Sequence, residues 1–322
     1  VTLVREFKFR HSDTTWTGVP IVAANMDTTG LFDIAKVLQG HKMLTCLQKF
    51  YSTRECEDAW SDGVDPGFVA ITCGSTENSF ELLKRKMATN GGTSMICVDV
   101  ANGYREVFLE FIKSIREGFP DSIVIAGNVA TREMTEALIL AGADIVKVGI
   151  GPGSVCTTRK VAGVGYPQLS AIAECADAAH GLGGHVMADG GCSSPGDVAK
   201  AFAAGSDFVM LGGMFAGHDE SGGELVEADN GKKYKSFYGM SSAKAMEEYY
   251  GEVAKHRAPE GKEVRVPYRG SLEDTIQSIL GGVRSACSYV GARRIKDLPK
   301  CTTFIRVTQT TNEVYQRFNV EE

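Results

Sequence analysis

Residues 141–149, Ala-Gly-Ala-Asp-Ile-Val-Lys-Val-Gly, run from a tight turn through a short apolar strand into a glycine loop. Residues 204–207, Ala-Gly-Ser-Asp, repeat the turn and again lead from a predicted helix into an apolar run. The repetition indicates a recurring αβ unit from which the fold is built, although each stretch alone could be an independent tight turn.

Eight short apolar runs recur along the chain. Each is followed by a loop that contains Gly, Asn or Asp and then by a helical pattern. They span residues 19–24, 43–47, 68–71, 95–100, 123–126, 145–148, 185–188 and 208–211. Such runs, separated by helices, indicate parallel strands buried on both faces. A doubly wound sheet could give the same order, but eight βα units in one chain favour a single (β/α)8 TIM barrel of the α/β class.

Residues 217–267 break this pattern with a polar stretch that contains Gly and Lys and is too long for an ordinary loop after the eighth strand. Long connections of this kind are commonly functional lids, so we predict a flap here and a helix over residues 271–289. No second core is indicated, and we expect one domain over residues 1–322. Because the sequence begins at Val1 without a methionine, we expect that an N-terminal segment is missing.

The composition excludes several classes of protein. Hydrophobic residues make up 43% and charged residues 23% of the 322 residues, which is typical of a globular chain with a sizeable core. No run approaches the ~18 apolar residues of a membrane span. A net charge of −6 without a long basic run argues against nucleic-acid binding. The nine cysteines form no C-x-x-C pair, no signal peptide is apparent and the six histidines lack metal-ligand spacing, so we expect a cytoplasmic protein without zinc.

Glycine pairs follow the last two predicted strands. In barrel enzymes the loops after the carboxyl ends of the strands carry the active site, and the last two commonly bind phosphate through backbone N–H groups. Gly190-Gly191 and Gly212-Gly213 fit this role, with the Ser154 hydroxyl as a further donor. Simple tight turns are the alternative interpretation.

One cysteine, Cys156, differs from the others because it lies in a Gly/Pro loop beside Arg159 and Lys160. Neighbouring cations and loop N–H groups favour the nucleophilic thiolate. A loop cysteine can also be an unreactive surface residue, but a place after the sixth strand favours catalysis. Asp99 ends the fourth strand, where it could face a ligand or cap a helix, and Lys49 follows the second strand.

Residues 149–159, Gly-Ile-Gly-Pro-Gly-Ser-Val-Cys-Thr-Thr-Arg, resemble the catalytic cysteine loop shared by IMP dehydrogenases and GMP reductases, and the likeness extends over nearly the whole chain. Within this family the chain is more similar to the reductases. Only a short segment separates Lys49 from Phe68, where dehydrogenases usually carry a regulatory insertion, and no equivalent of their Arg-Tyr pair is found. Further family-like phrases are residues 189–191, 210–213 and 238–242, and reductase-like ones are residues 99–104, 239–242 and 256–261.

The resemblance implies an NADPH-dependent oxidoreductase of purine salvage that converts GMP to IMP and releases ammonia. By this resemblance the Cys156 thiolate attacks C2 of the guanine, Thr158 and Glu260 move protons to the departing amino group, and NADPH reduces the thioimidate that remains. We further expect a homotetramer, because family members form tetramers with sites near subunit boundaries, and no nucleic-acid or membrane partner.

The resemblance also implies which residues contact each ligand. Those for GMP are Ser154, Asp189, Gly190, Gly191, Gly212, Gly213, Gly239, Met240, Ser241, Arg257, Ala258, Pro259 and Gly261. Those for NADPH are Lys49, Asp99, Val100, Ala101, Ile150, Gly151, Met240, His256, Arg257, Ser285, Ala286, Cys287 and Ser288. A potassium ion is implied at the backbone of Gly151, Gly153 and Cys156 and the region of Arg159.

Two features depart from the family pattern. The stretch that usually precedes the first barrel strand is absent, and Gln48-Lys49-Phe50 lacks the histidines that often flank this lysine in animal reductases. Two alternatives stay open. One is an IMP dehydrogenase without its regulatory domain, and the other is a catalytically inactive nucleotide-binding regulatory barrel.

Overall fold

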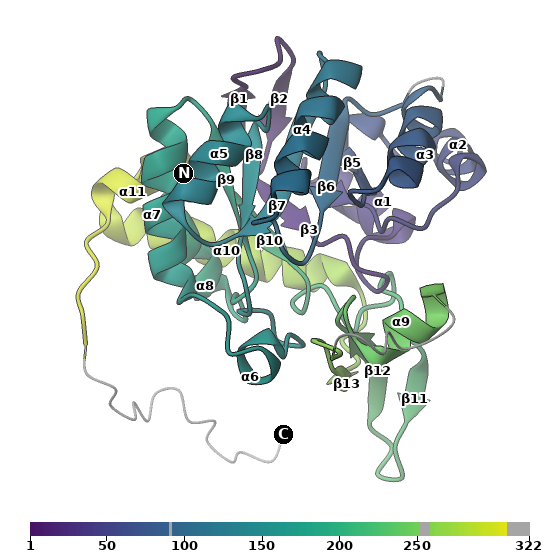
Figure 1. Ribbon diagram of the computed structural model, residues 1–322. Helices are drawn as coiled ribbons and strands as arrows, with labels where there is room; N and C mark the ends of the chain where they lie inside the picture. Colours follow the sequence, from purple (N-terminus) through teal and green to yellow (C-terminus); the bar gives the residue numbers. More distant parts are fainter. Residues whose placement is uncertain (90–91, 251–257, 308–322) are drawn as a thin grey trace.

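The computed structural model describes residues 1–89, 92–250 and 258–307 (Figure 1). Its centre is a closed barrel of parallel strands in the order β10-β3-β4-β5-β6-β7-β8-β9. The strands are β3 (Ile21–Ala23), β4 (Leu44–Cys46), β5 (Val69–Cys73), β6 (Met95–Asp99), β7 (Ile123–Val129), β8 (Ile145–Val148), β9 (His185–Asp189) and β10 (Phe208–Leu211). Each overlaps one of the predicted apolar runs, so the predicted (β/α)8 barrel is confirmed.

Helices surround the barrel and bury the outward side chains of its strands. They are α1 (Phe32–Gly40), α2 (Thr53–Ser61), α3 (Glu77–Met87), α4 (Glu106–Gly118), α5 (Arg132–Leu140), α7 (Gln168–Gly181), α8 (Pro195–Ala203) and α10 (Leu272–Val290). Shorter turns are η1 (Pro66–Phe68), α6 (Thr158–Val161), η2 (Ile295–Asp297) and α11 (Leu298–Cys301). At the start of α8, Ser194 and Asp197 form a reciprocal capping box.

Side chains alternate along each barrel strand between the lumen and the helical layer. On β8, Ile145 packs into the lumen with residues of the other strands, whereas Val146 and Val148 pack against the outer helices. The same alternation turns Lys147 inward, and its side chain is only 3% exposed. A lysine therefore lies in the lumen, near the carboxyl ends of the strands.

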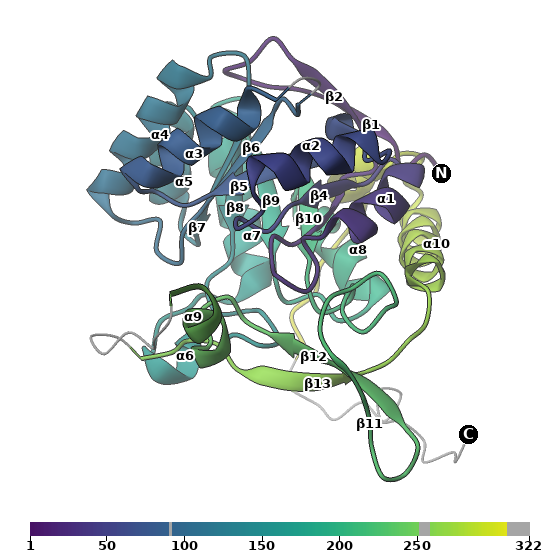
Figure 2. The same cartoon turned by 90° about the vertical axis from the view of Figure 1, so that its right-hand side faces the viewer.

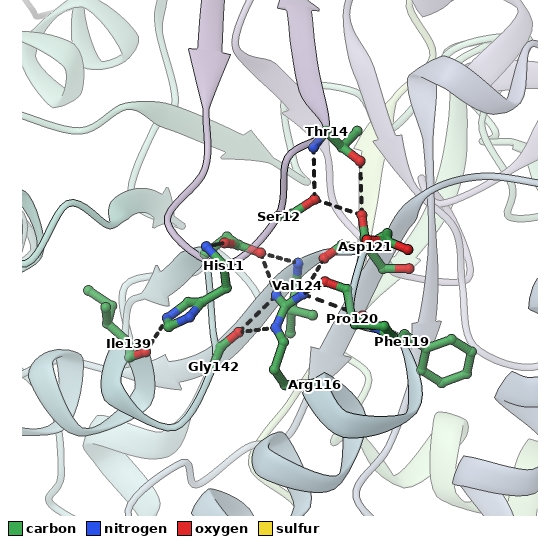
Figure 3. Close-up of polar contacts among 12 residues, drawn as sticks. His11, Ser12, Thr14, Arg116, Phe119, Pro120, Asp121, Val124, Ile139 and Gly142 are labelled. Atoms are coloured by element: carbon green, nitrogen blue, oxygen red, sulfur yellow. Dashed lines mark hydrogen bonds and ion pairs between the residues drawn. The ribbon is translucent and has the colours of Figure 1, made fainter.

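An antiparallel hairpin of β1 (Arg5–Lys8) and β2 (Thr15–Gly18) covers the amino-terminal end of the barrel. Phe7 closes the lumen by stacking on Phe208, with ring centroids 4.3 Å apart. Figure 3 shows how the hairpin turn is held: the Ser12 hydroxyl donates to the carbonyl of Asp121, and a ring nitrogen of His11 lies 2.7 Å from the carbonyl oxygen of Ile139. The sequence patterns did not predict this hairpin.

The flap lies at the opposite end of the barrel from this hairpin (Figures 1 and 2). It contains β11 (Leu225–Glu227), β12 (Lys233–Tyr238), α9 (Ala243–Tyr250) and β13 (Glu263–Pro267), and its strands form an antiparallel sheet in that order. Phe237 anchors the sheet by packing against Val155 and Ala216 of the barrel loops. The polar segment predicted as a flap thus contains regular structure among its described residues, where β12 pairs with both β11 and β13.

No helix in the described part of the chain combines the length and the apolar character needed to cross a bilayer.

Candidate active site

The loop between β8 and α6 carries Cys156 at the carboxyl end of the barrel. Gly149 begins it, and a Cβ at this position would lie 2.1 Å from the carbonyl oxygen of Asp189, so only glycine allows β8 and β9 to end this close together. The Cys156 side chain is partly exposed, whereas most other cysteines are buried. Its thiol is therefore accessible from the barrel mouth.

Cys156, Thr158 and Glu260 form a continuous hydrogen-bonded chain. The Cys156 thiol donates to Thr158 Oγ1 over 3.3 Å, and the Thr158 hydroxyl donates to Glu260 Oε2 over 2.6 Å. This second contact is short, as expected for a hydroxyl bound to a carboxylate. The chain gives a proton a path from sulfur to carboxylate, so the three predicted catalytic residues lie together.

Backbone contacts hold Glu260 against the cysteine loop. The carbonyl of Glu260 accepts the N–H of Thr157 at 2.9 Å, and its own N–H donates to the carbonyl of Ser241 at 3.0 Å. A Cβ at the next residue, Gly261, would lie 2.8 Å from the nitrogen of Ser242, which only glycine avoids. The flap thus supplies the carboxylate, and the barrel supplies the thiol.

The predicted phosphate loops also converge. Gly190 and Gly191 both adopt positive φ angles, 90° and 86°, and lie against Pro152 of the cysteine loop. A Cβ at Gly213 would lie 3.0 Å from the Ser154 hydroxyl oxygen, so Ser154 lies beside the second glycine pair. Short glycine loops around a hydroxyl give an anion close access to backbone N–H groups.

A charge cluster beneath these loops joins the predicted Asp99 and Asp189 to Lys147, which the sequence patterns missed. Lys147 Nζ lies 2.5 Å from Asp99 Oδ1 and 2.9 Å from Asp189 Oδ2. Burial disfavours the charge on Lys147, but the two carboxylates outweigh it and raise its pKa well above the ordinary value. Asn128 donates to Asp189 Oδ2 at 2.9 Å. A lone lysine inside an apolar strand was the available sequence signal.

The flap meets the loop after β3 through Asp27. Tyr238 donates its hydroxyl to Asp27 Oδ2 at 2.9 Å, and the backbone N–H of Asp27 points to the sulfur of Met240 at 3.4 Å. Burial raises the pKa of the Asp27 carboxyl above its ordinary value, although Tyr238 opposes that rise. Tyr249 of α9 stacks on Phe50 with ring centroids 3.4 Å apart. Both contacts hold the flap over the barrel mouth.

Apart from Met240, His256 and Arg257, the residues implied for the nicotinamide cofactor fall into two groups. Lys49, Asp99, Val100, Ala101, Ile150 and Gly151 all lie in loops or strand ends at the carboxyl end of the barrel. The segment 285–288 lies on α10, about 20 Å along the helix axis from its start near the flap at ~1.5 Å per residue. The residues just after this helix pair with Thr2, beside the amino-terminal hairpin (Figure 2). Within a single chain, the residues at the barrel mouth and residues 285–288 are therefore not part of one site.

Backbone carbonyls in the cysteine loop fit the implied cation. Among the described residues, those of Gly151 and Cys156 accept no hydrogen bond, while that of Gly153 accepts the N–H of Cys156 at 3.1 Å. Arg159 turns its guanidinium to the carbonyl of Tyr166. Within the described ranges no cluster of three or more His, Cys, Asp or Glu side chains could hold a metal.

Several of the remaining predicted residues that the structure describes lie on the flap. Ala258 and Pro259 lead directly into Glu260, and Gly239 lies against the Val155 carbonyl, where its Cβ would be 3.3 Å away. His256 and Arg257 fall outside the described residues.

Comparisons with known proteins cover almost the whole chain. Residues 7–314 match the IMP dehydrogenase / GMP reductase domain. The GMP reductase of Caenorhabditis elegans is 59% identical over 99% of this chain and 90% of its own length. GMP reductase 2 of Homo sapiens is 58% identical over 98% and 90% of the two chains, and the GMP reductase of Tolumonas auensis is 57% identical over 98% and 91%.

Proposed function

Because this chain belongs to the IMP dehydrogenase / GMP reductase family, we propose that it is a GMP reductase, which uses NADPH to convert GMP to IMP and releases ammonia. The observation that carries the proposal is the hydrogen-bonded chain from Cys156 through Thr158 to Glu260. Such a chain suits a reaction that needs both a sulfur nucleophile and a proton donor for a poor leaving group.

The first step is attack by sulfur on the purine. Thr158 and Glu260 take the proton from Cys156, and the thiolate adds to C2, the electrophilic carbon between two ring nitrogens. The adduct still carries the amino group, which leaves only after protonation. Glu260 returns a proton through the Thr158 hydroxyl to this nitrogen, ammonia departs, and a thioimidate to Cys156 remains.

Bound NADPH would supply the hydride that replaces the amino group at C2. The residues at the barrel mouth fit such a cofactor, because Asp99 offers a carboxylate to ligand hydroxyls and Lys49 offers a cation next to it. Expulsion of the Cys156 thiolate then gives IMP, and the enzyme returns to its starting state. The overall change consumes one proton for each ammonia released.

The remaining residues position the substrate. The backbone around Gly190, Gly191, Gly212 and Gly213, with the Ser154 hydroxyl, would bind the phosphate of GMP, and the base would lie between Cys156 and the flap residues Gly239, Met240 and Ser241. The unused carbonyls of Gly151 and Cys156 support a potassium ion, which would hold the cysteine loop in shape.

The cofactor site supports an assembly of several subunits. Ser285 and Ser288 are exposed on α10 but lie away from their own barrel mouth, so they could reach a cofactor only in a neighbouring subunit. We therefore propose a homotetramer in which each subunit is one barrel domain with a flap over about residues 217–267. Nine free thiols favour a reducing compartment, and we propose the cytoplasm.

The test is to add GMP to the protein with NADPH and potassium and to measure NADPH oxidation and ammonia together. Equal amounts of both products support the proposal. Cys156→Ala should abolish turnover, whereas Cys301→Ala, which changes an exposed cysteine of α11, should not. Reduction of NAD with IMP, without activity on GMP, would instead identify a dehydrogenase. Binding of GMP without turnover of either nucleotide would identify an inactive barrel.

A further inference from the structure

Lys147 is a buried cation that the proposed mechanism does not use. Its side chain is 3% exposed, and its nitrogen contacts Asp99 on β6 and Asp189 on β9 at 2.5 and 2.9 Å. The two carboxylates are 26% and 23% exposed, so each keeps part of its surface toward the barrel mouth. A single nitrogen thus connects two partly accessible acids on different strands.

Strand β7 leaves the space that this contact requires. Gly127 pairs with Asp99 on one side and with Lys147 on the other. A Cβ at Gly127 would lie 2.4 Å from the carbonyl oxygen and 2.7 Å from the Cβ of Lys147. Because Gly127 has no side chain, the Lys147 side chain can pass over β7 inside the barrel and reach Asp99 on β6.

The charges of the cluster depend on one another. An isolated buried ammonium or carboxylate would be costly, and the cluster satisfies both types by pairing them. Burial tends to raise the pKa of Asp99, but Lys147 and then Lys49 lower it overall. Other titratable groups that interact with Lys147 or Asp99 include the thiols of Cys46, Cys73 and Cys97.

Asp189 has a second contact, Asn128, which also bonds to the start of the cysteine loop. Asn128 donates to both Asp189 Oδ2 and the carbonyl of Gly149, at 2.9 and 2.8 Å. Asp189 is therefore held to the start of the cysteine loop, while Asp99 is held mainly by Lys147 and by a hydrogen bond from Asn25. Lys147 therefore links the Asp99 side chain directly to Asp189, which Asn128 ties to the start of the cysteine loop.

We propose that Lys147 is a positioning residue that couples the cofactor side of the site, at Asp99, to the substrate side, at Asp189, so that each ligand binds more tightly when the other is present. This rests on the proposed function, which puts NADPH at Asp99 and GMP at Asp189. Coupling of this kind is reciprocal, and typical values change an affinity by about 5- to 150-fold.

The experiment measures GMP binding by calorimetry with and without saturating NADP⁺, a cofactor form that permits no turnover. The variants are Lys147→Met, which keeps length but removes charge, and Lys147→Arg, which keeps the charge. Lys113→Met on α4 is the control, because that lysine is exposed and pairs with the exposed Glu110. In the wild type we expect NADP⁺ to tighten GMP binding at least fivefold, within the usual range of such coupling.

In Lys147→Met we expect this ratio to fall to about 1 and kcat/KM to fall about 10- to 100-fold, as for other residues that orient a ligand-binding group. Lys147→Arg should retain much of the coupling. The acid limb of the kcat/KM profile should move to higher pH in Lys147→Met, because Asp99 loses the cation that lowers its pKa. A residue needed only for folding would not change this profile. If Lys147→Met does not fold, Lys147→Gln replaces it, since its amide can still donate to one carboxylate.

Two failures are distinct. A wild-type protein that neither binds GMP nor oxidises NADPH with it contradicts the proposed function and the coupling built on it. A wild-type protein that turns GMP over, while the neutral variant keeps the full NADP⁺ effect on GMP binding, contradicts the role of Lys147 alone.

Discussion

Asp144 and Asp207 occupy the same step of two repeated turns, and each carboxylate accepts a backbone N–H from the preceding barrel strand. Asp144 Oδ2 accepts from Val124 at 3.0 Å, and Asp207 Oδ2 accepts from Val186 at 3.1 Å. Both aspartates are buried, and an arginine neutralises each: Arg116 for Asp144 and Arg5 for Asp207. The sequence repeat thus corresponds to a repeated tie between neighbouring strands.

Arg116→Met should destabilise the protein strongly. The Asp144 side chain is fully buried, and removal of its partner leaves an uncompensated charge, which costs about 3–5 kcal/mol. The matched control is Lys113→Met on the same helix, whose partner Glu110 is exposed, and it should change stability by less than about 1 kcal/mol. Thermal melting measures both. Similar melting temperatures for the two variants would refute this account of Asp144.

His180 should stabilise the protein in a pH-dependent way. Its hydrogen bond to Asp207 raises the pKa of His180 above 6.5, against the effect of burial. This contribution is fully present below pH 6.5 and is lost as the pH rises through the raised pKa. His180→Gln should therefore lower the melting temperature more at pH 6 than at pH 9. Because the side chain is 46% exposed, we expect a difference of only about 1–2 °C. An equal loss at both pH values would count against the idea.

Tyr238→Phe should weaken closure of the flap. The change removes the hydroxyl that donates to Asp27, a contact worth about 1 kcal/mol, so KM for GMP should rise about fivefold with little change in kcat. Tyr268→Phe is the control, since it removes an exposed hydroxyl contact to Asp219 at the other end of the sheet. Steady-state kinetics measure KM for GMP in both variants. An equal rise in KM would show that the contact with Asp27 has no particular role in closing the flap.

Glu260→Gln should lower kcat about 10²- to 10⁴-fold, because an amide cannot take the proton that Thr158 passes on. GMP affinity, measured by calorimetry, should change little. Glu263→Gln is a control on the same segment, since that carboxylate pairs with Lys244 and Ser236 instead. Full activity of Glu260→Gln would show that proton transfer does not need the Glu260 carboxylate.

The barrel was predictable because its strands are buried on both faces and so appear as nearly continuous apolar runs. The ends of the strands were predicted less accurately. β5 extends to Cys73 and β7 extends to Val129, beyond the predicted runs 68–71 and 123–126. The β1–β2 hairpin was missed because each strand is only four residues long and half exposed. The flap strand β13 alternates exposed and partly exposed residues, which looks like a polar loop.

For the site, the family-like loops indicated which residues to consider, and the structure supplies the contacts. Cys156 and Thr158 are neighbours in the sequence, but nothing local in the sequence places Glu260 2.6 Å from Thr158. That distance depends on how the flap returns across the barrel. Lys147 was overlooked because one polar residue in an apolar strand was treated as part of the run, whereas its depth in the lumen depends on Gly127 of the neighbouring strand.

The hairpin and the flap lie at opposite ends of the barrel, so substitutions near one are far from substitutions near the other. We expect the buried contacts of Asp144 and Asp207 to contribute to thermal stability, and we propose that the chemistry occurs at Cys156. Because effects of distant substitutions usually add, a heat-tolerant amino-terminal end selected in one variant could be combined with an altered specificity selected in another. Stability gained at the hairpin end would compensate for destabilising substitutions at the flap end.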